Sequence, residues 1–152
     1  MCDDTRFDHI FAYHGELVKR ICHGVRVCDP WAVLEAARAF SIELPPDATI
    51  IPMPGHNGRA VSMLMVANAI SRMRPDIRVM DVLLCIPHES VYLQKKQGWK
   101  PAPVSMFTED GEQHEGAIII DSVIDTGNTA MAAINCLRTA RVMAFAMVVD
   151  QT

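Results

Sequence analysis

The segment I-I-I-D-S-V-I-D-T-G-N-T, residues 118–129, places a run of isoleucines directly before a carboxylate and a glycine-containing turn. Such an apolar run predicts a buried strand, and the spacing of the residues that follow predicts a helix. In a strand–loop–helix unit, the free N–H groups and the positive end of the helix face the loop. Gly127 would allow a close backbone approach to a ligand, and Thr126 and Thr129 would add hydroxyl donors. The segment therefore predicts either a phosphate-binding loop, with Asp121 near an attached sugar, or a plain strand–turn–helix junction.

Short apolar segments alternate with helical segments along most of the chain. The predicted strands are 48–53, 79–86, a short one near 104–107, 117–121 and 142–149. Near-continuous apolar strands separated by helices predict a mainly parallel sheet that is flanked by helices on both faces. Ligands of such sheets bind at the carboxyl ends of the strands. Functional residues are therefore expected in three loops, 54–59, 87–116 and 121–129.

The first 46 residues are expected to be helical and to belong to one domain with an α/β core at 47–152. Apolar residues recur at helical spacing over about 8–22 and predict an amphipathic helix. Asp29-Pro30 predicts the cap and the first residue of a second helix, because aspartate accepts N–H groups at a helix start and proline tolerates the first helical position. The whole chain is therefore expected to be a single α/β domain.

Composition places the chain among globular proteins and argues against several partners. Of the 152 residues, 50% are hydrophobic and 21% are charged, which suits one domain with a sizeable core. A net charge of -4 and the absence of a basic cluster argue against nucleic acid as a partner. No apolar run reaches the roughly 18 residues that span a bilayer, and the acidic start does not suit a signal peptide. A cytoplasmic protein without a membrane partner is therefore expected. The five cysteines form no C-x-x-C pair, which favours separate reduced thiols.

Residues 118–129 resemble the phosphoribosyl pyrophosphate-binding motif of type I phosphoribosyltransferases, in which apolar, acidic and again apolar residues precede T-G-x-T. The resemblance implies the fold of that family, a Rossmann-like α/β domain. It also implies that Asp121 and Ser122 hold the ribose, that Asp121 places Mg²⁺, and that Asp125 is a general base toward a nucleobase. The 5′-phosphate would be wrapped by Asp125, Thr126, Gly127, Asn128 and Thr129. Ser122 departs from the family pattern, because its neutral hydroxyl makes a weaker hydrogen bond than a second carboxylate would.

Two further segments support the resemblance. The apolar-P-x-P sequence at 51–54 is similar to the ComF-like branch of the family, and a pyrophosphate-binding loop follows the first core strand in the family as a whole. That loop would consist of Gly55, His56, Asn57, Gly58 and Arg59, in which the arginine can pair with a diphosphate. The family also closes a loop over its active site, which makes Lys95 and Lys96, together with Lys100, candidates for shielding the leaving diphosphate. An ordinary turn and a solvated basic loop are the respective alternatives.

The function implied by the resemblance is transfer of a 5-phosphoribosyl group from phosphoribosyl pyrophosphate to a nitrogen nucleophile, such as a nucleobase. Mg²⁺ would be the cofactor, the chemistry belongs to nucleotide metabolism, and homodimers are common in the family. Ser122 and the short 55–59 loop favour a second interpretation, a non-catalytic phosphoribosyl-binding module with a regulatory role. A third interpretation rests on D-T-G at 125–127, which also resembles the aspartic protease element, but that element belongs in an all-β chain.

Overall fold

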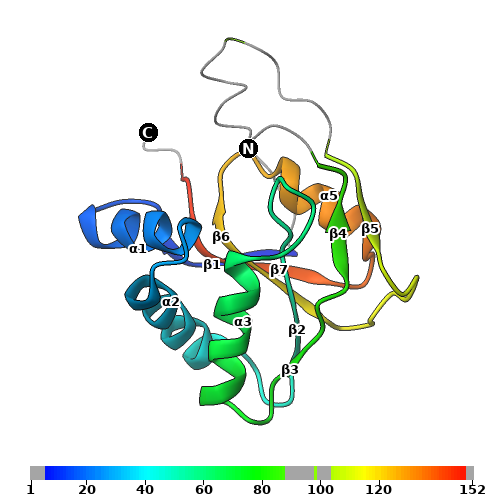
Figure 1. The fold of residues 1–152 in the computed structure, drawn as a ribbon, viewed down its shortest axis with the longest axis horizontal. Coiled ribbons are helices and arrows are strands. Elements are labelled where there is room, and N and C mark those ends of the chain that lie inside the picture. The colour runs from blue at the N-terminus through cyan, green and yellow to red at the C-terminus, as the bar shows by residue number, and fades with distance from the viewer. Residues whose placement is uncertain (1–5, 88–97, 99–103, 150–152) are drawn as a thin grey trace.

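The computed structural model describes residues 6–87, residue 98 and residues 104–149. Strands and helices alternate along most of the chain (Figure 1), which confirms the predicted α/β class. No helix in these residues is both long enough and apolar enough to cross a membrane. The elements in chain order are β1 (Phe7–Ala12), α1 (Glu16–Arg26), α2 (Pro30–Glu43), β2 (Thr49–Pro52), α3 (Ser62–Met73), β3 (Arg78–Val79), β4 (Leu83–Cys85), β5 (Met106–Thr108), β6 (Ile118–Ile124), α5 (Asn128–Cys136) and β7 (Arg141–Met147).

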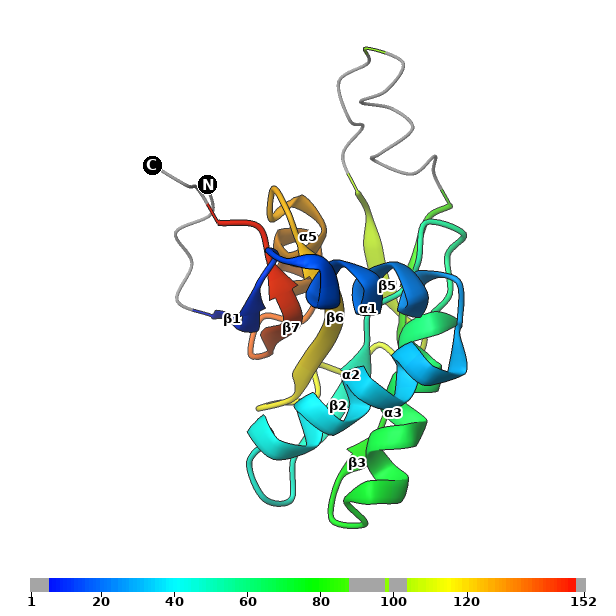
Figure 2. The ribbon, with the colours of Figure 1, turned by 90° about the vertical axis from the view of Figure 1, so that its left-hand side faces the viewer.

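Five of the strands form one parallel sheet in the order β1-β7-β6-β2-β3. The central strand is β6, whose Ile118 pairs with Ile50 of β2 and with Arg141 of β7. The helices α1, α2 and α3 pack against one another on one face, and α5 covers the opposite face (Figure 2). Both faces are covered, so the first half of the central strand is apolar on both sides, and Ile118, Ile119 and Ile120 are all buried.

The two short strands β4 and β5 form a separate antiparallel ladder beside this sheet. Leu83 pairs with Thr108, and Cys85 pairs with Met106. The helix α5 contacts β5, so the ladder lies at the side of the molecule that α5 covers. The ladder flanks the segment 88–103, of which only Gly98 is described.

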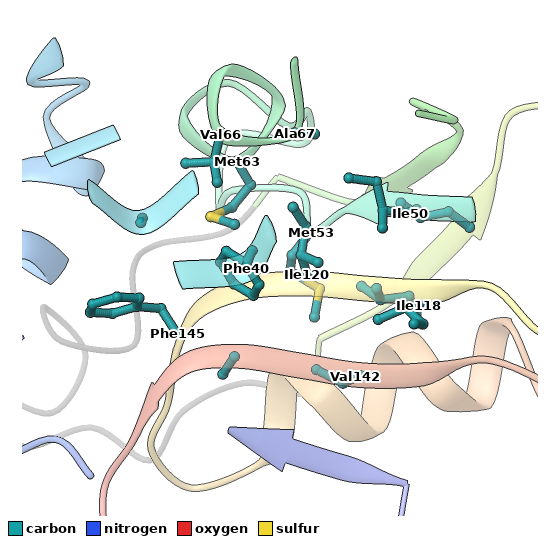
Figure 3. Close-up of a cluster of buried hydrophobic side chains, with 14 of the residues drawn as sticks. Phe40, Ile50, Met53, Met63, Val66, Ala67, Ile118, Ile120, Val142 and Phe145 are labelled. Atoms are coloured by element: carbon teal, nitrogen blue, oxygen red, sulfur yellow. The ribbon is translucent and has the colours of Figure 1, made fainter. Parts of the chain in front are cut away.

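Much of the hydrophobic core lies between the sheet and the layer formed by α2 and α3 (Figure 3), and α5 adds buried residues from the opposite face. Phe40 of α2, Ile50 of β2 and Val66 of α3 are fully buried. Burying a side chain of this kind stabilises a fold by roughly 1.5–3 kcal/mol. The helix α1 joins the same core at Gly24, where a Cβ atom would lie 2.4 Å from the Cβ of Ala32 on α2. The two amino-terminal helices are therefore packed into the single domain rather than appended to it.

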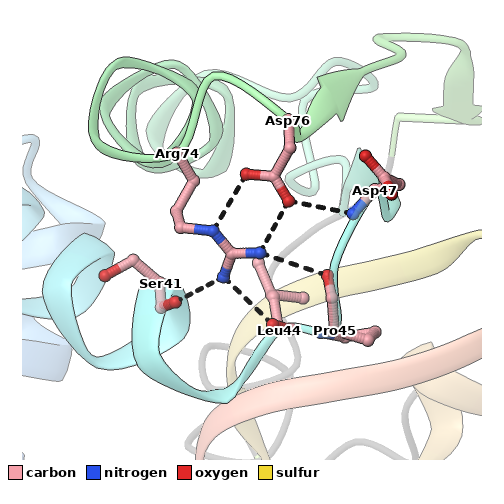
Figure 4. A network of polar contacts seen from close by, with 6 residues as sticks. All are labelled: Ser41, Leu44, Pro45, Asp47, Arg74 and Asp76. Atoms are coloured by element: carbon pink, nitrogen blue, oxygen red, sulfur yellow. Dashed lines mark hydrogen bonds and ion pairs between the residues drawn. The ribbon is translucent and has the colours of Figure 1, made fainter.

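A polar cluster joins the ends of α2 and α3 (Figure 4). The Arg74 guanidinium donates to both carboxylate oxygens of Asp76, at 3.0 and 2.7 Å. It also donates to the backbone carbonyls of Ser41 at 2.7 Å and of Leu44 at 3.0 Å. Asp76 in turn accepts the backbone N–H of Asp47 at 2.9 Å. The hydrogen bond from Arg74 is the main reason that the pKa of the Asp76 carboxyl lies well below its ordinary value. The cluster fixes the turn that leads from α2 into β2.

The predicted helix over 8–22 is wrong in its first half, so residues 1–46 are not helical throughout. The chain forms the edge strand β1 there, with Phe7 opposite Val142 of β7, and α1 begins only at Glu16. Gly15 separates the two elements with a φ of 85°, a conformation that suits glycine and cannot belong to a right-handed helix. Pairing with a strand from the other end of the chain therefore outweighs the local helical spacing.

The predicted strand over 79–86 is also wrong as a single element, because β3 belongs to the parallel sheet and β4 to the separate ladder. The other elements lie near their predicted positions. The predicted cap of α2 is confirmed as well, since the Asp29 side chain accepts the Ala32 N–H at 3.1 Å and Pro30 is the first helical residue.

Candidate functional site

The loops that follow β2 and β6 lie next to each other at the carboxyl edge of the sheet (Figure 1). The two strands are parallel neighbours, in which Pro52 pairs with Ile120. The Met53 N–H continues this pairing and donates to the Ile120 carbonyl at 2.9 Å. The segments 54–59 and 125–129, which are far apart in the sequence, are therefore brought to the same edge.

The loop after β6 has the geometry of an anion-binding helix start. The strand ends at Ile124, and Gly127 adopts a left-handed conformation, with φ 88° and ψ -1°, directly before α5 begins. The Thr126 hydroxyl accepts the Asn128 N–H at 3.4 Å, and no side-chain hydrogen bond caps the helix from the Gly127 position. Asp125, Thr126 and Asn128 are exposed. Because the first N–H groups of a helix lack partners within it, an anion can bind at this positive end.

The loop after β2 is closed by its own hydrogen bonds. The Gly55 N–H donates to the Arg59 carbonyl at 2.9 Å, and the Gly58 N–H donates to the Gly55 carbonyl at 3.0 Å. The Arg59 N–H also reaches the side-chain oxygen of Asn57 at 3.4 Å. The backbone N–H groups of Gly55 and Gly58, which the sequence predicts to bind a diphosphate, are therefore already hydrogen-bonded within the loop. The exposed members of the loop include Arg59, Asn57 and His56, so a ligand would meet side chains here.

Asp121 lies within β6 and not at the edge of the sheet, where we expected it. It is in register with Ala144 of β7, and the pairing of the two strands continues to Ile124 and Met147. Its Oδ1 atom accepts the backbone N–H of Ser122 at 2.7 Å, and both residues are half-buried. The predicted strand ended too early, because Asp121 and Ser122 interrupt the run of apolar residues. In the structure the pairing of β6 with β7 continues past these two residues.

The carboxyl group of Asp121 is in a poorly solvated position. Burial raises its pKa to about 7, although the hydrogen bond from the Ser122 amide and the charge of Arg26 both favour its ionised form. At neutral pH the group is therefore about equally protonated and ionised. Burial also raises the pKa of the Cys22 thiol to about 11, and Asp121 adds to that rise. Cys22 and Arg26 are one turn apart on α1, so this helix lies within electrostatic reach of the carboxyl group.

Sequence reasoning missed this contribution of α1. No local pattern relates Cys22 or Arg26 to Asp121, and only the packing of α1 against β6 brings them close.

The lysine candidates Lys95, Lys96 and Lys100 lie outside the described residues.

Two shallow hollows lie along α1. One of about 590 Å³ is lined by Glu16, Leu17, Lys19 and Arg20. The second, of about 420 Å³, is lined by Arg20, His23, Gly24, Val27, Asp29 and Trp31, and the Arg20 guanidinium stacks 4.8 Å from the centre of the Trp31 ring. Neither hollow is lined by residues of the two loops, so the hollows do not define the candidate site.

The described residues contain no group of three histidine, cysteine, aspartate or glutamate side chains that could hold a metal ion. Mg²⁺ is often held by one or two carboxylates together with the phosphates of a substrate. Asp121 fits that mode of binding as a single carboxylate, and the remaining oxygens would have to come from the ligand.

No protein-family model matches the chain, and no curated protein matches it either. The relation of residues 118–129 to phosphoribosyltransferases is therefore a prediction from the motif itself.

Proposed function

We propose that the protein binds phosphoribosyl pyrophosphate at the carboxyl edge of the sheet and transfers the 5-phosphoribosyl group to a nitrogen nucleophile. One observation carries this proposal. The start of α5, which Gly127 precedes, lies at the same edge of the sheet as the loop after β2, in which Arg59 is exposed. Phosphoribosyl pyrophosphate carries a phosphate on one side of its ribose and a diphosphate on the other. The start of α5 would suit the phosphate, and the arginine-bearing loop after the neighbouring strand β2 would suit the diphosphate.

The 5′-phosphate would occupy the start of α5. Backbone N–H groups at Gly127 and in the first turn would donate to it, and the hydroxyls of Thr126 and Thr129 would add hydrogen bonds. The left-handed conformation of Gly127 supports this role, because the absence of a Cβ atom lets the backbone approach the ligand. Asp125 is exposed at the beginning of the same loop and would accept a proton from the nitrogen nucleophile.

The ribose hydroxyls would bind to Asp121 and Ser122. An ionised carboxylate accepts hydrogen bonds from hydroxyls strongly, and it does so best where water is excluded. The raised pKa of Asp121 shows that the folded chain holds this carboxyl in a position that disfavours its charge. Such groups occur often at functional sites, because a ligand that donates hydrogen bonds can compensate for the lost solvation.

The diphosphate would lie over the loop after β2, where the exposed Arg59 can pair with it. Asp121 would be the carboxylate that holds Mg²⁺ together with diphosphate oxygens. When bound, Mg²⁺ supplies positive charge that stabilises the leaving diphosphate. Because only an ionised carboxyl binds the metal, binding of Mg²⁺ and diphosphate should release a proton from Asp121 near neutral pH.

A second function is favoured by one observation. Ser122 occupies the position at which the phosphoribosyl pyrophosphate-binding motif has a second acidic residue. Its neutral hydroxyl would bind the ribose and Mg²⁺ more weakly than a carboxylate would. A phosphoribosyl-binding module without turnover is therefore the alternative to a transferase. The aspartic protease interpretation requires an all-β chain, and the D-T-G element here leads from a parallel sheet into the helix α5.

Calorimetric titration with phosphoribosyl pyrophosphate and Mg²⁺ tests binding, and release of pyrophosphate with a panel of nucleobases tests turnover. Removing the Thr126 hydroxyl with Thr126→Val should weaken binding about tenfold or more, because a hydrogen bond to a charged group is lost. Thr139→Val is the matched control, since Thr139 is exposed beyond the other end of α5. Binding without release of pyrophosphate would support the module, and no binding at millimolar ligand would contradict both functions.

A further inference from the structure

The side chain of Cys85 reaches the inside of the loop after β2. Cys85 is the last residue of β4 and is buried, with 3% of its surface exposed. Its thiol donates to the Gly55 carbonyl at 3.1 Å, and its backbone N–H donates to the Gly58 carbonyl at 3.0 Å. One residue therefore holds both glycines of the loop.

The backbone of Gly58 also lies close to Cys85 and Pro87. A Cβ atom at Gly58 would lie 3.0 Å from the Cys85 carbonyl oxygen and 3.4 Å from the Cγ of Pro87. Gly58 also has a φ of 108°, which disfavours any other residue. The loop and the end of β4 are thus packed backbone against backbone, without room for a side chain between them.

The chemistry of the thiol suits a structural donor. Burial raises the pKa of Cys85, so the group stays protonated and keeps its S–H hydrogen for the Gly55 carbonyl. The Gly55 carbonyl also accepts the Gly58 N–H at 3.0 Å, so two donors converge on one oxygen. Without the thiol, the Gly55 carbonyl would lose its only side-chain donor among the described residues, and the backbone N–H of Cys85 would remain the hydrogen bond between β4 and the loop.

We propose that Cys85 is a positioning residue for the loop after β2, which it fixes to β4 so that Arg59 and its neighbours are held ready for a diphosphate. Cys85 does not touch the ligand and acts through the shape of the loop. This inference rests on the proposed function, since it assigns the loop to the diphosphate end of the substrate. A loop fixed before binding loses less conformational freedom when the ligand binds.

The test compares two ligands and two variants. Cys85→Val removes the donor and keeps a side chain of similar size, whereas Cys85→Ser keeps a donor. With Mg²⁺ present, Cys85→Val should weaken binding of inorganic pyrophosphate about tenfold, which corresponds to about 1.4 kcal/mol. Binding of ribose 5-phosphate, which would use β6 and the loop after it but not the loop after β2, should stay within about twofold of the wild type, and Cys85→Ser should restore most of the pyrophosphate affinity. Cys136→Val is the control, because Cys136 lies at the other end of α5.

Two results separate this inference from the proposed function. If the wild type binds both ligands and Cys85→Val binds pyrophosphate equally well, the role of Cys85 is wrong and the proposed function stands. If the wild type binds neither ligand, the proposed function fails and the positioning role fails with it. Amide hydrogen exchange provides a measurement without ligand, for which Cys85→Ala is a second variant should valine not fit. Exchange at Gly55 and Gly58 should be faster in Cys85→Val and Cys85→Ala than in Cys85→Ser, and equal exchange in all three would also overturn the inference.

Discussion

The half-buried carboxyl group of Asp121 should make the protein less stable as the pH rises. Its pKa is about 7 in the folded chain, against an ordinary value of 3.8. The folded state therefore keeps its proton over a range in which the unfolded state has already lost it. By linkage, the contribution of this group to stability is fully present below about pH 4 and is lost progressively as the pH rises to about 7. The loss continues through the folded pKa and is nearly complete by about pH 8.

The size of the effect follows from the shift. A difference of about three pKa units, at about 1.4 kcal/mol for each unit, gives about 4 kcal/mol at pH 8. Asp121 keeps some contact with solvent, which reduces the effective penalty. A loss of about 2–4 kcal/mol is therefore expected for the wild type between pH 4 and pH 8 from this one group.

The substitution Asp121→Asn removes the titration and keeps the local geometry. Asparagine has the same shape, and its side-chain oxygen can still accept the Ser122 N–H. The variant should equal the wild type in unfolding free energy near pH 4 and exceed it by about 2–4 kcal/mol at pH 8. Urea unfolding at pH 4.5, 6 and 8, followed by circular dichroism, measures the difference. Asp81→Asn, which changes an exposed aspartate between β3 and β4, is the control and should show no such gain at pH 8.

A variant that is less stable than the wild type at pH 8, or a difference that is constant with pH, would refute the reasoning. Either result would mean that the folded state does not disfavour the ionised form of this carboxyl group. The same variant should also bind ribose 5-phosphate more weakly despite its greater stability, since a neutral amide binds hydroxyls less strongly than a carboxylate does. Stability gained together with binding lost is the pattern expected of a residue kept for function.

Three further substitutions test separate parts of the structure. Gly127→Ala should lower the unfolding free energy by about 1–2 kcal/mol in urea titrations and weaken phosphate binding, because alanine is strained in the left-handed conformation; unchanged stability would contradict that conformation. Asp29→Ala should lower the unfolding free energy by about 1 kcal/mol, because the cap of α2 loses its hydrogen bond to the Ala32 N–H; a neutral result would mean that the helix does not depend on this cap. Arg74→Met should lower the Tm in a thermal melt more than Arg72→Met does, since Arg74 alone of the two joins α2 to α3, and equal effects would argue against the cluster.

The parts of the fold that sequence reasoning predicted are those determined by local patterns. Three consecutive isoleucines before Asp121 predicted the central strand, and Asp29-Pro30 predicted the start of α2. The glycine at position 127 predicted a turn into a helix, and the structure has it in the left-handed conformation. In each case neighbouring residues carry the physical cause, so the sequence is sufficient.

The parts that were missed depend on contacts between distant segments. Residues of β1 form a strand because they pair with β7 in the parallel sheet, although the spacing of their apolar residues also suits a helix. The segment 79–86 divides because its two halves join different sheets. The environment of Asp121 depends on α1, whose Arg26 is far away in the sequence. None of these contacts leaves a periodic signal, so a single sequence does not contain them.

The most direct test of the central claim is the response of the Gly127 amide to ribose 5-phosphate. In two-dimensional NMR spectra of the ¹⁵N-labelled protein, the Gly127 and Thr129 amide signals should shift with saturation as the ligand is added, because the phosphate binds at the start of α5. Ribose without a phosphate should leave these two signals nearly unchanged, and Thr126→Val should require a higher ligand concentration. If millimolar ribose 5-phosphate produces no saturable shift at Gly127, the loop after β6 does not bind phosphate and the account is wrong.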